Sequence, residues 1–318
     1  MRPSLFRGFD GGGRALRTLV GLAFLTAASL LHAAEVERTL SATPTGEVEV
    51  RNLAGSVRVT GWDRNEVVIV GRLEEGQELD VHARDGRILI EVSQPDWRMT
   101  RAAELELRIP RQSRLRMNSV SADLDVEGVT GSQTLQSVSG SLESRGFEAD
   151  LEARTVSGEI RINGTANPGR VEVATVTGSV RVENAAGNLE VSTVKGEVVI
   201  HGGRFERVRF NGVNADIHGH LELTRDGRLE ADSVSGRLAI VLPADLPARF
   251  DLESFTGRIA PCDGQSAERA SRYAPGYRLL FTRGEGTAVV QARSMSGEIT
   301  LCEPTTLTQL SRPRSGAE

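Results

Sequence analysis

Apolar residues recur along this chain at fixed distances from a serine or threonine. In Leu189–Ile200, with Thr193 as position zero, apolar residues lie at positions −4, −2, +1, +5 and +7, and glycine lies at +3. Partial copies centre on Ser137 and Gly212. The full template also fits Val48–Val59, Leu115–Val126, Leu151–Ile162, Val171–Val182, Leu229–Ile240, Phe250–Ile259 and Val290–Leu301.

The spacing of these copies predicts the fold class. Neighbouring zero positions lie 18 to 21 residues apart, and the last two lie 40 apart. They fall at Ser119, Ser137, Thr155, Thr175, Thr193, Gly212, Ser233, Ser254 and Ser294. Self-similarity near 20 residues is typical of a solenoid. We therefore expect an all-β protein, a parallel β-solenoid (β-helix or β-roll) of about nine or ten 18–21-residue coils stacked ~4.8 Å apart.

Each copy also predicts the course of one coil. Side chains alternate between the two faces of a strand, so the change of parity between positions −2 and +1 indicates a kink, and the glycine marks a corner. Ala122 and Ala215 replace that glycine, which indicates that the corner needs a small inward side chain more than a positive φ. Serine and threonine at positions zero and +2 are expected to form hydroxyl columns that bond between coils.

The rest of the chain divides around these coils. Residues 1–34 have the form of a secretory signal peptide: arginines, an apolar run from Leu19 to Leu31, then His32-Ala33-Ala34. The run is too short to span a bilayer, so we expect export to the periplasm or the exterior, with no membrane span after cleavage. The alternative is an uncleaved N-terminal anchor. Residues 35–110 form an N-terminal β-rich module, or an irregular start of the same stack. Residues 111–303 form the solenoid, and residues 304–318 a disordered tail.

Composition and charge exclude some partners. A net charge of −5 and a pI near 5.7 provide no clustered basic face for nucleic acid. Aromatic residues make up 4% of the chain, and its tryptophans and tyrosines, Trp62, Trp97, Tyr273 and Tyr277, all lie outside the regular coils. A groove that stacks sugars on aromatic rings is therefore not expected.

Four hexapeptides carry a resemblance to a known family. They are Ser137–Leu142, Thr155–Ile160, Ser233–Leu238 and Ser294–Ile299, each of the form Ser/Thr-apolar-Ser-Gly-x-apolar. Together with the strand that ends at Pro110, they resemble a bacterial domain-of-unknown-function family of β-strand repeat proteins often described as candidate adhesins. The resemblance covers roughly residues 40–303. It implies an exported β-solenoid without established catalytic residues or cofactors.

Two kinds of residue invite a catalytic interpretation. The repeated Ser-x-Ser-Gly motif has no histidine at a fixed offset to act as its base, so we interpret it as structural. Outward carboxylates such as Asp123, Asp125, Glu143 and Glu159 could hydrolyse glycosides, but a charged face that protects the sheet edges accounts for them equally simply. We assign no catalytic, cofactor-binding or metal-binding residues.

Two further pairs fall at position +8. His201 and His220 should lie on adjacent coils, with Glu183 at the same offset one coil earlier, so a zinc-like site and a solvated polar ladder are both open. The two cysteines, Cys262 and Cys302, share this column and predict a disulfide, provided that their coils are neighbours.

The sequence thus favours a non-enzymatic exported protein that acts as an envelope interaction surface or structural scaffold, with an adhesin-like role as one form of it. The expected partner is another envelope protein or a glycan. The alternatives are a carbohydrate-active enzyme on a β-helix, recognisable by converging carboxylates, and an envelope polymer joined end to end through open coil edges.

Overall fold

The computed structural model describes residues 34–94, 101–261, 266–271, 275–302, and within them every regular element is a strand. Ala33–Glu318 forms one compact unit. The signal-peptide segment and the tail from residue 303 lie outside the described residues, so both remain predictions. No described helix is long and apolar enough to cross a membrane.

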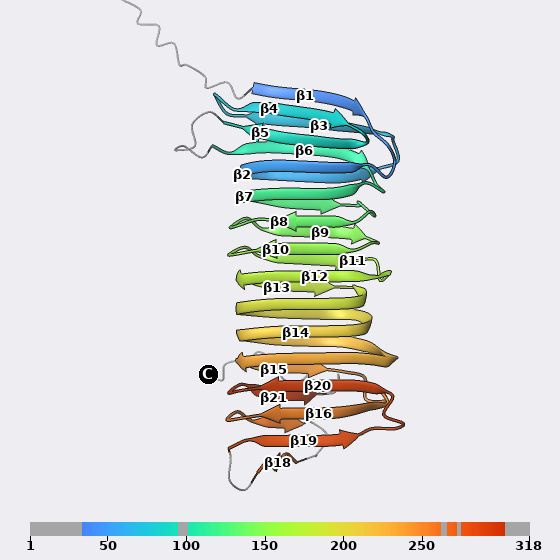
Figure 1. Ribbon diagram of the computed structural model, residues 1–318, viewed down its shortest axis with the longest axis vertical. Coiled ribbons are helices and arrows are strands. Elements are labelled where there is room, and N and C mark those ends of the chain that lie inside the picture. Colours follow the sequence, from blue (N-terminus) through green and yellow to red (C-terminus); the bar gives the residue numbers. More distant parts are fainter. Residues whose placement is uncertain (1–33, 95–100, 262–265, 272–274, 303–318) are drawn as a thin grey trace, which may run out of the picture. The chain divides into compact units, whose positions relative to one another are not determined.

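Parallel strand pairs build the repeated part of the chain (Figure 1). These strands are β7 (Arg114–Glu127), β8 (Gln133–Gln136), β9 (Leu142–Phe147), β10 (Leu151–Thr155), β11 (Ile160–Gly164), β12 (Pro168–Thr177), β13 (Val180–Glu183), β14 (Ala186–Ser235) and β15 (Arg237–Val241). Equivalent template positions pair directly, as Thr175 does with Thr193. The all-β, solenoid-like architecture is therefore as the repeat predicts.

The N-terminal strands continue the same pairing. They are β1 (Ala34–Ser41), β2 (Glu47–Trp62), β3 (Glu66–Leu73), β4 (Glu78–Arg84), β5 (Arg87–Ser93) and β6 (Ala103–Pro110). β2 is parallel to β7 on one side and to β5 and β6 on the other, so pairing is continuous across residue 110. Beyond them, β4 pairs with β5, and β3 pairs with β6 and β1, all antiparallel.

At the C-terminal end, the coils do not follow one another in sequence order. The strands are β16 (Ala248–Ser254), β17 (Ile259–Pro261), β18 (Glu268–Arg269), β19 (Tyr277–Thr282), β20 (Ala288–Ser294) and β21 (Glu298–Cys302). β20 lies between β14 and β16, and β21 lies between β15 and β17. The coil that comes last in sequence is thus inserted inside the stack, while β19 and β18 pair antiparallel outside β16.

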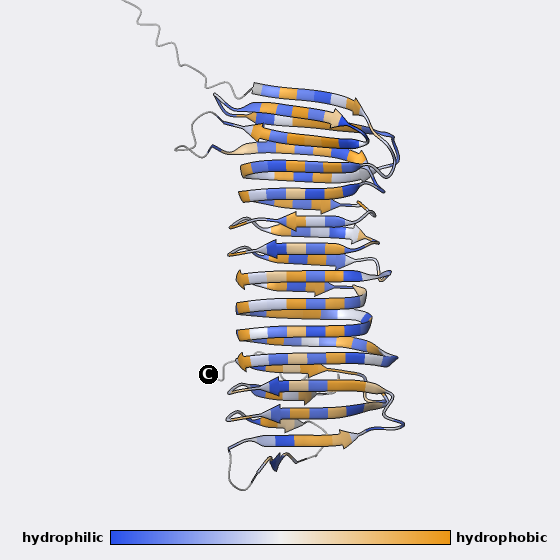
Figure 2. Ribbon diagram, viewed as in Figure 1, coloured by the Kyte–Doolittle hydropathy of each residue, from blue (hydrophilic) through white to orange (hydrophobic). Residues whose placement is uncertain are grey.

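The core lies between the two arms of each coil. In β12, Val171, Val173 and Thr175 are buried, and the next residue, Val176, is 43% exposed. Position zero therefore continues the inward alternation of −4 and −2, and the second arm contributes +5 and +7. Figure 2 shows the resulting alternation of hydropathy along the strands. The predicted kink between −2 and +1 lies slightly later: the strand continues inward to position zero, the chain turns between zero and +3, and +1 points outward.

Close backbone contact explains the glycine at +3. A Cβ on Gly158 would lie 2.0 Å from the carbonyl oxygen of Gly140 in the preceding coil, and one on Gly178 would lie 2.2 Å from that of Gly158. Only some corners, such as Gly55 and Gly236, have a positive φ. Lack of space, more than backbone conformation, therefore selects glycine.

Gly158→Ala should destabilise the fold by roughly 1–3 kcal/mol, because the new methyl group meets a backbone oxygen that cannot rotate away. The matched control is Gly219→Ala, also buried, whose Cβ would lie 3.4 Å from a movable leucine methyl group. Urea unfolding of both variants measures the difference. Equal stability of the two would show that the corner is not crowded.

Candidate binding groove

In five coils the turn is closed by the hydroxyl group at position zero. The backbone N–H of Gly140 donates to Ser137 Oγ at 3.0 Å, and that of Gly158 donates to Thr155 Oγ1 at 3.2 Å. The same bond occurs in the coils of Ser119, Ser254 and Ser294. It fixes positions +1 and +2 at the tip of the turn.

The hydroxyl group at position +2 bonds the neighbouring coil. Ser139 donates both its backbone N–H (2.9 Å) and its Oγ hydroxyl (3.3 Å) to the carbonyl oxygen of Val120, and Ser157 bonds Val138 in the same way. The predicted bonding between coils is thus made at +2, whereas the hydroxyl at zero mostly serves its own turn. The +1 carbonyl groups are consequently occupied along the stack.

These turns line up the +1 side chains on the surface. We call this row the apolar ladder; its members are 41–59% exposed. In spatial order they are Leu53, Val120, Val138, Val156, Val176, Val194, Val213, Val234, Met295 and Phe255. A continuous row of exposed apolar side chains on a folded protein indicates an interaction site.

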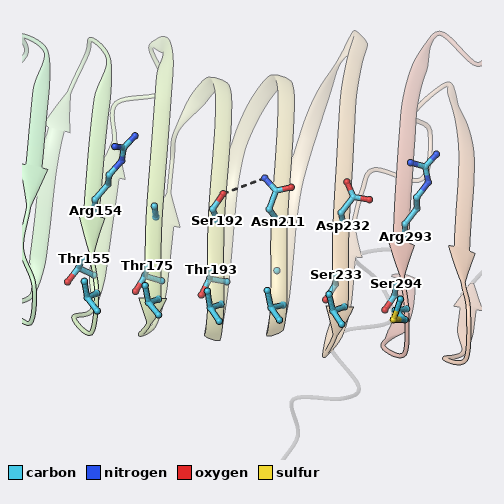
Figure 3. Close-up of a pocket in the computed structure, with 18 of the residues that line it drawn as sticks. Arg154, Thr155, Thr175, Ser192, Thr193, Asn211, Asp232, Ser233, Arg293 and Ser294 are labelled. Atoms are coloured by element: carbon cyan, nitrogen blue, oxygen red, sulfur yellow. Dashed lines mark hydrogen bonds between the residues drawn. The ribbon is translucent and has the colours of Figure 1, made fainter.

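A groove of about 1020 Å³ runs beside the ladder, from the coil of Ser137 to that of Ser254 (Figure 3). Template positions −1, zero and +1 line it. Arg154 lies toward one end, and Asp232 and Arg293 lie toward the other. Val120 and Val138 belong to the ladder but not to the groove.

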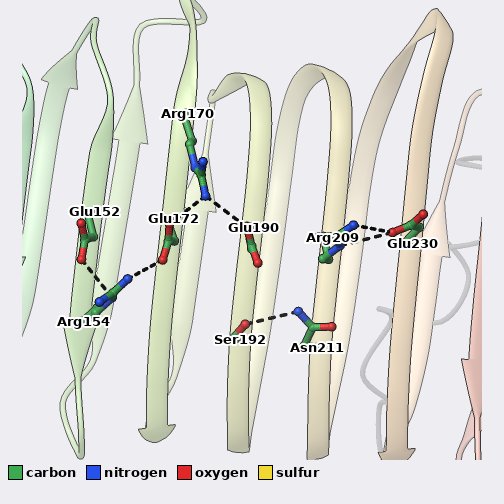
Figure 4. Close-up of polar contacts among 9 residues, drawn as sticks. All are labelled: Glu152, Arg154, Arg170, Glu172, Glu190, Ser192, Arg209, Asn211 and Glu230. Carbon is green, nitrogen blue, oxygen red and sulfur yellow. Dashed lines mark hydrogen bonds and ion pairs between the residues drawn. The ribbon is translucent and has the colours of Figure 1, made fainter.

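Ion pairs follow the outward face next to this groove (Figure 4). Arg154 bonds Glu152 at 3.0 Å and Glu172 at 2.6 Å, and Arg170 joins Glu172 at 3.1 Å. The hydrogen bond from Arg154 is the main reason that the pKa of Glu172 lies below its usual value. The bond from Arg209 lowers the pKa of Glu230 in the same way.

The histidine column forms as its spacing predicts. The His201 and His220 rings lie 5.5 Å apart between centroids at 63°, and the backbone of Glu183 pairs with that of His201. Across the described residues, no group of three His, Cys, Asp or Glu side chains is arranged to hold a metal ion.

The cysteine pair falls on coils that are neighbours. β17 and β21 pair Ile259 with Ile299 and Pro261 with Leu301, which is the condition set for a bridge. Cys262 and the side chain of Cys302 lie outside the described residues, so the disulfide stays a prediction.

The outward carboxylates already have partners. Arg145 lies 2.9 Å from Asp125 and 2.6 Å from Glu143, Glu159 pairs with Arg161 at 2.6 Å, and Asp123 accepts the Ser141 hydroxyl. Such pairs form a charged surface and leave no carboxylate of this set poised as an acid or base.

From the repeat, the apolar residue at +1 is expected only to mark a kink, and no groove is predicted. The signal was present in the parity: positions −4, −2 and zero share one face, so an apolar residue at +1, between two hydroxyl residues of a turn, must face outward.

The geometry defines an all-β stack of parallel coils with a surface groove along one row of turns. The family model of Toastrack DUF4097 matches residues 42–302, and the chain belongs to this family. No curated protein matches the sequence significantly.

Solved structures with a similar arrangement are distant in sequence. One is a candidate adhesin from Bacteroides fragilis, with 11% identity, a TM-score of 0.42 and coverage of 85% of this chain and 97% of that one. Another is a candidate lipid-binding protein from Parabacteroides distasonis, with 11% identity, a TM-score of 0.43 and coverage of 84% and 96%. A candidate adhesin from the same species has 9% identity, a TM-score of 0.38 and coverage of 86% and 98%.

The turn hydroxyl groups allow a matched test. Thr155→Val removes the acceptor of the Gly158 N–H and should cost about 1 kcal/mol of unfolding free energy. Thr193→Val should be neutral or slightly stabilising, since Thr193 Oγ1 is buried without a hydrogen-bond partner. Denaturant unfolding compares the two; an equal loss in both would contradict a specific role of the turn bond.

The ion pairs predict a dependence of stability on pH. The folded-state pKa of Glu172 is lowered, so its contribution is present above the usual value of 4.5 and disappears as the pH falls through the folded pKa. Glu172→Gln should lower the unfolding free energy by ~0.5–1 kcal/mol near neutral pH, and by less at about pH 3. Urea unfolding at both pH values measures this, and a cycle with Arg154→Gln isolates the pair. If Glu172→Gln lowers the unfolding free energy by the same amount at both pH values, the ionic explanation is refuted.

Proposed function

We propose that this protein is a non-enzymatic scaffold, exported to the periplasm or the exterior, that binds an extended partner in the groove beside the apolar ladder. The exposed row of aliphatic side chains is the observation that carries this proposal. Water leaves this row favourably only when another molecule covers it. The groove follows successive coils, so its form fits a partner that is long and narrow.

The surface chemistry supports binding rather than catalysis. The groove is lined mainly by apolar and hydroxyl side chains, with Arg154, Asp232, Glu253 and Arg293 also among its lining residues. The outward carboxylates Asp125, Glu143 and Glu159 are paired with arginine. The sequence of residues 1–34 supports export, because it has the three regions of a signal peptide.

The ends of the stack favour a discrete scaffold over a polymer. End-to-end assembly of coils requires open parallel edges. Here β3 and β1 continue beyond β6 as antiparallel strands, and β19 and β18 do so beyond β16. These strands occupy the outer edges of β6 and β16, on which another parallel coil would add.

Binding of a neutral apolar dye tests the groove. The full chain should enhance the fluorescence of N-phenyl-1-naphthylamine, and Val176→Ser/Val213→Ser should weaken that binding about fivefold or more, because it removes apolar area from the groove. The control, Val120→Ser/Val138→Ser, changes ladder residues of similar exposure outside the groove. It should bind as the wild type does. Equal binding by all three proteins would overturn the proposed function.

A further inference from the structure

The apolar ladder extends over the whole repeated part of the chain. Its ten side chains are 41–59% exposed, and one stands on each coil from Leu53 to Phe255. A molecule that covers the entire row is therefore of similar length and offers apolar groups at the spacing of the coils, ~4.8 Å. A second copy of this chain meets both conditions with its own ladder.

The middle of the row allows a second row to come close. Val176 and Val194 are the fifth and sixth of the ten members. Beside them, position −1 carries the small residues Ala174 and Ser192, whereas the long side chain of Arg154 stands one coil farther out (Figure 3). Small side chains at the centre of a surface let two copies of that surface pack closely there.

Three charged side chains near the C-terminal end of the row have no partner. Asp232, Arg293 and Glu253 occupy position −1 of three neighbouring coils, since β20 pairs with β14 on one side and with β16 on the other. All three side chains are exposed, and none has a hydrogen bond or an ion pair with another described residue. Arg154, at the same position of its coil, is bonded to two glutamates. The three unpaired charges therefore remain available to a molecule that covers the ladder.

We propose that the apolar ladder is the interface of an antiparallel homodimer, in which the ladder of a second copy packs along it. This inference rests on the proposed function and names its partner: the long, narrow molecule is another copy of this chain. The twofold axis is perpendicular to the stack and lies between the coils of Thr175 and Thr193. Val176 then faces Val194 of the second copy, and the −1 side chains of the two copies face each other. Such an interface is isologous, so it closes at two copies and forms no filament.

This register provides partners for the charged end of the row. Arg51 is at position −1 of the Leu53 coil, so it faces Glu253 of the second copy. Arg51 is 47% exposed and bonds Glu49 of its own chain, and its guanidinium has further donors for a second carboxylate. By the same symmetry, an amide side chain faces each of the other two charges: Gln136 of the second copy faces Asp232, and Asn118 of the second copy faces Arg293. An amide can donate to a carboxylate and accept from a guanidinium.

Charge also disfavours the two nearest registers. Moving the axis by half a coil toward the N-terminal end places Arg51 opposite Arg293 of the second copy. Moving it by half a coil toward the C-terminal end places Lys195, at +2 of the Thr193 coil, opposite Lys195 of the second copy. Like charges that face each other across an interface suppress that arrangement. Either shift also leaves one end of each ladder uncovered.

Sedimentation velocity of the full chain tests the dimer. We expect a reversible dimer, and Val176→Asp should raise its Kd about a hundredfold or more, because the new carboxylate would be covered by Val194 of the second copy without a partner. The matched control is Leu280→Asp, which changes an aliphatic side chain that is 52% exposed and lies outside the ladder. Its Kd should stay within about twofold of the wild type. Urea unfolding verifies that both variants fold.

Cysteine cross-linking tests the direction and register of the two rows. Val138 faces Val234 of the second copy, so a mixture of Val138→Cys and Val234→Cys should be joined efficiently by a short bismaleimide. Each variant alone should be joined far less, because its two introduced thiols would lie about 24 Å apart, which is five coil steps. The wild type, treated in the same way, controls for the native cysteines.

A chain that stays monomeric at about 100 μM, a Kd above the top of the micromolar range, would overturn the proposal. So would equal effects of Val176→Asp and Leu280→Asp, or more cross-linking of Val138→Cys alone than of the mixture, which would indicate parallel rows. The neutral dye judges the proposed function separately, at a concentration at which the chain is monomeric. Groove-dependent dye binding by a chain that forms no dimer would leave the proposed function standing, and loss of both would remove it as well.

Discussion

The close approach of backbone to backbone at the turns is the constraint on which this structure depends. Parallel coils share one set of hydrogen bonds, so equivalent turns must lie directly against each other. At +3 the inward Cβ direction of one coil points at the carbonyl oxygen of the coil before it, only 1.9–2.2 Å from a Cβ placed there in most of the stack. Glycine at this position lets the two arms close on a narrow core. In five of the coils the hydroxyl group at position zero then supplies the acceptor that the corner N–H would otherwise lack.

The same constraint creates the binding surface. In each turn the side chain at position zero points inward, and the hydroxyl group at +2 bonds the neighbouring coil. The side chain between them, at +1, therefore points into solvent. Repetition turns that single exposed residue into a row. The geometry of the coil therefore explains why this row of side chains is exposed. It does not explain why the row is apolar, because the coil could equally have carried polar residues there. The packing of the core does not explain why valine recurs at +1, where its side chain is 43–47% exposed in successive coils.

The periodicity was sufficient to predict the architecture because hydrogen bonding between coils demands equal spacing. It also placed His201 beside His220, since residues at one offset must share a column. Its parity already implies that the +1 residue faces outward, but it could not predict a groove beside this row, because valine is as typical of a core as of a ligand-binding surface. Nor could it predict the insertion of the Ser294 coil between those of Ser233 and Ser254. The position of a coil in the stack depends on which open strand edge it pairs with. Because all coils share one template, the repeat does not determine which edge the last coil pairs with.

The irregular strands at the two ends of the stack allow the regular coils between them to serve as a binding surface. If the coils simply ended, both terminal edges would present unpaired N–H and C=O groups to any other strand. At the C-terminal end the chain instead passes outward through β16 and β17, adds β18 and β19 in the antiparallel sense, and returns to complete the stack from within. At the N-terminal end β1 and β3 serve the same purpose outside β6. Antiparallel strands occupy the outer edges of β6 and β16, and most of the exposed large apolar side chains lie in one row of turns. A lone exposed stripe favours a specific ligand, whereas a stripe beside open edges would favour aggregation.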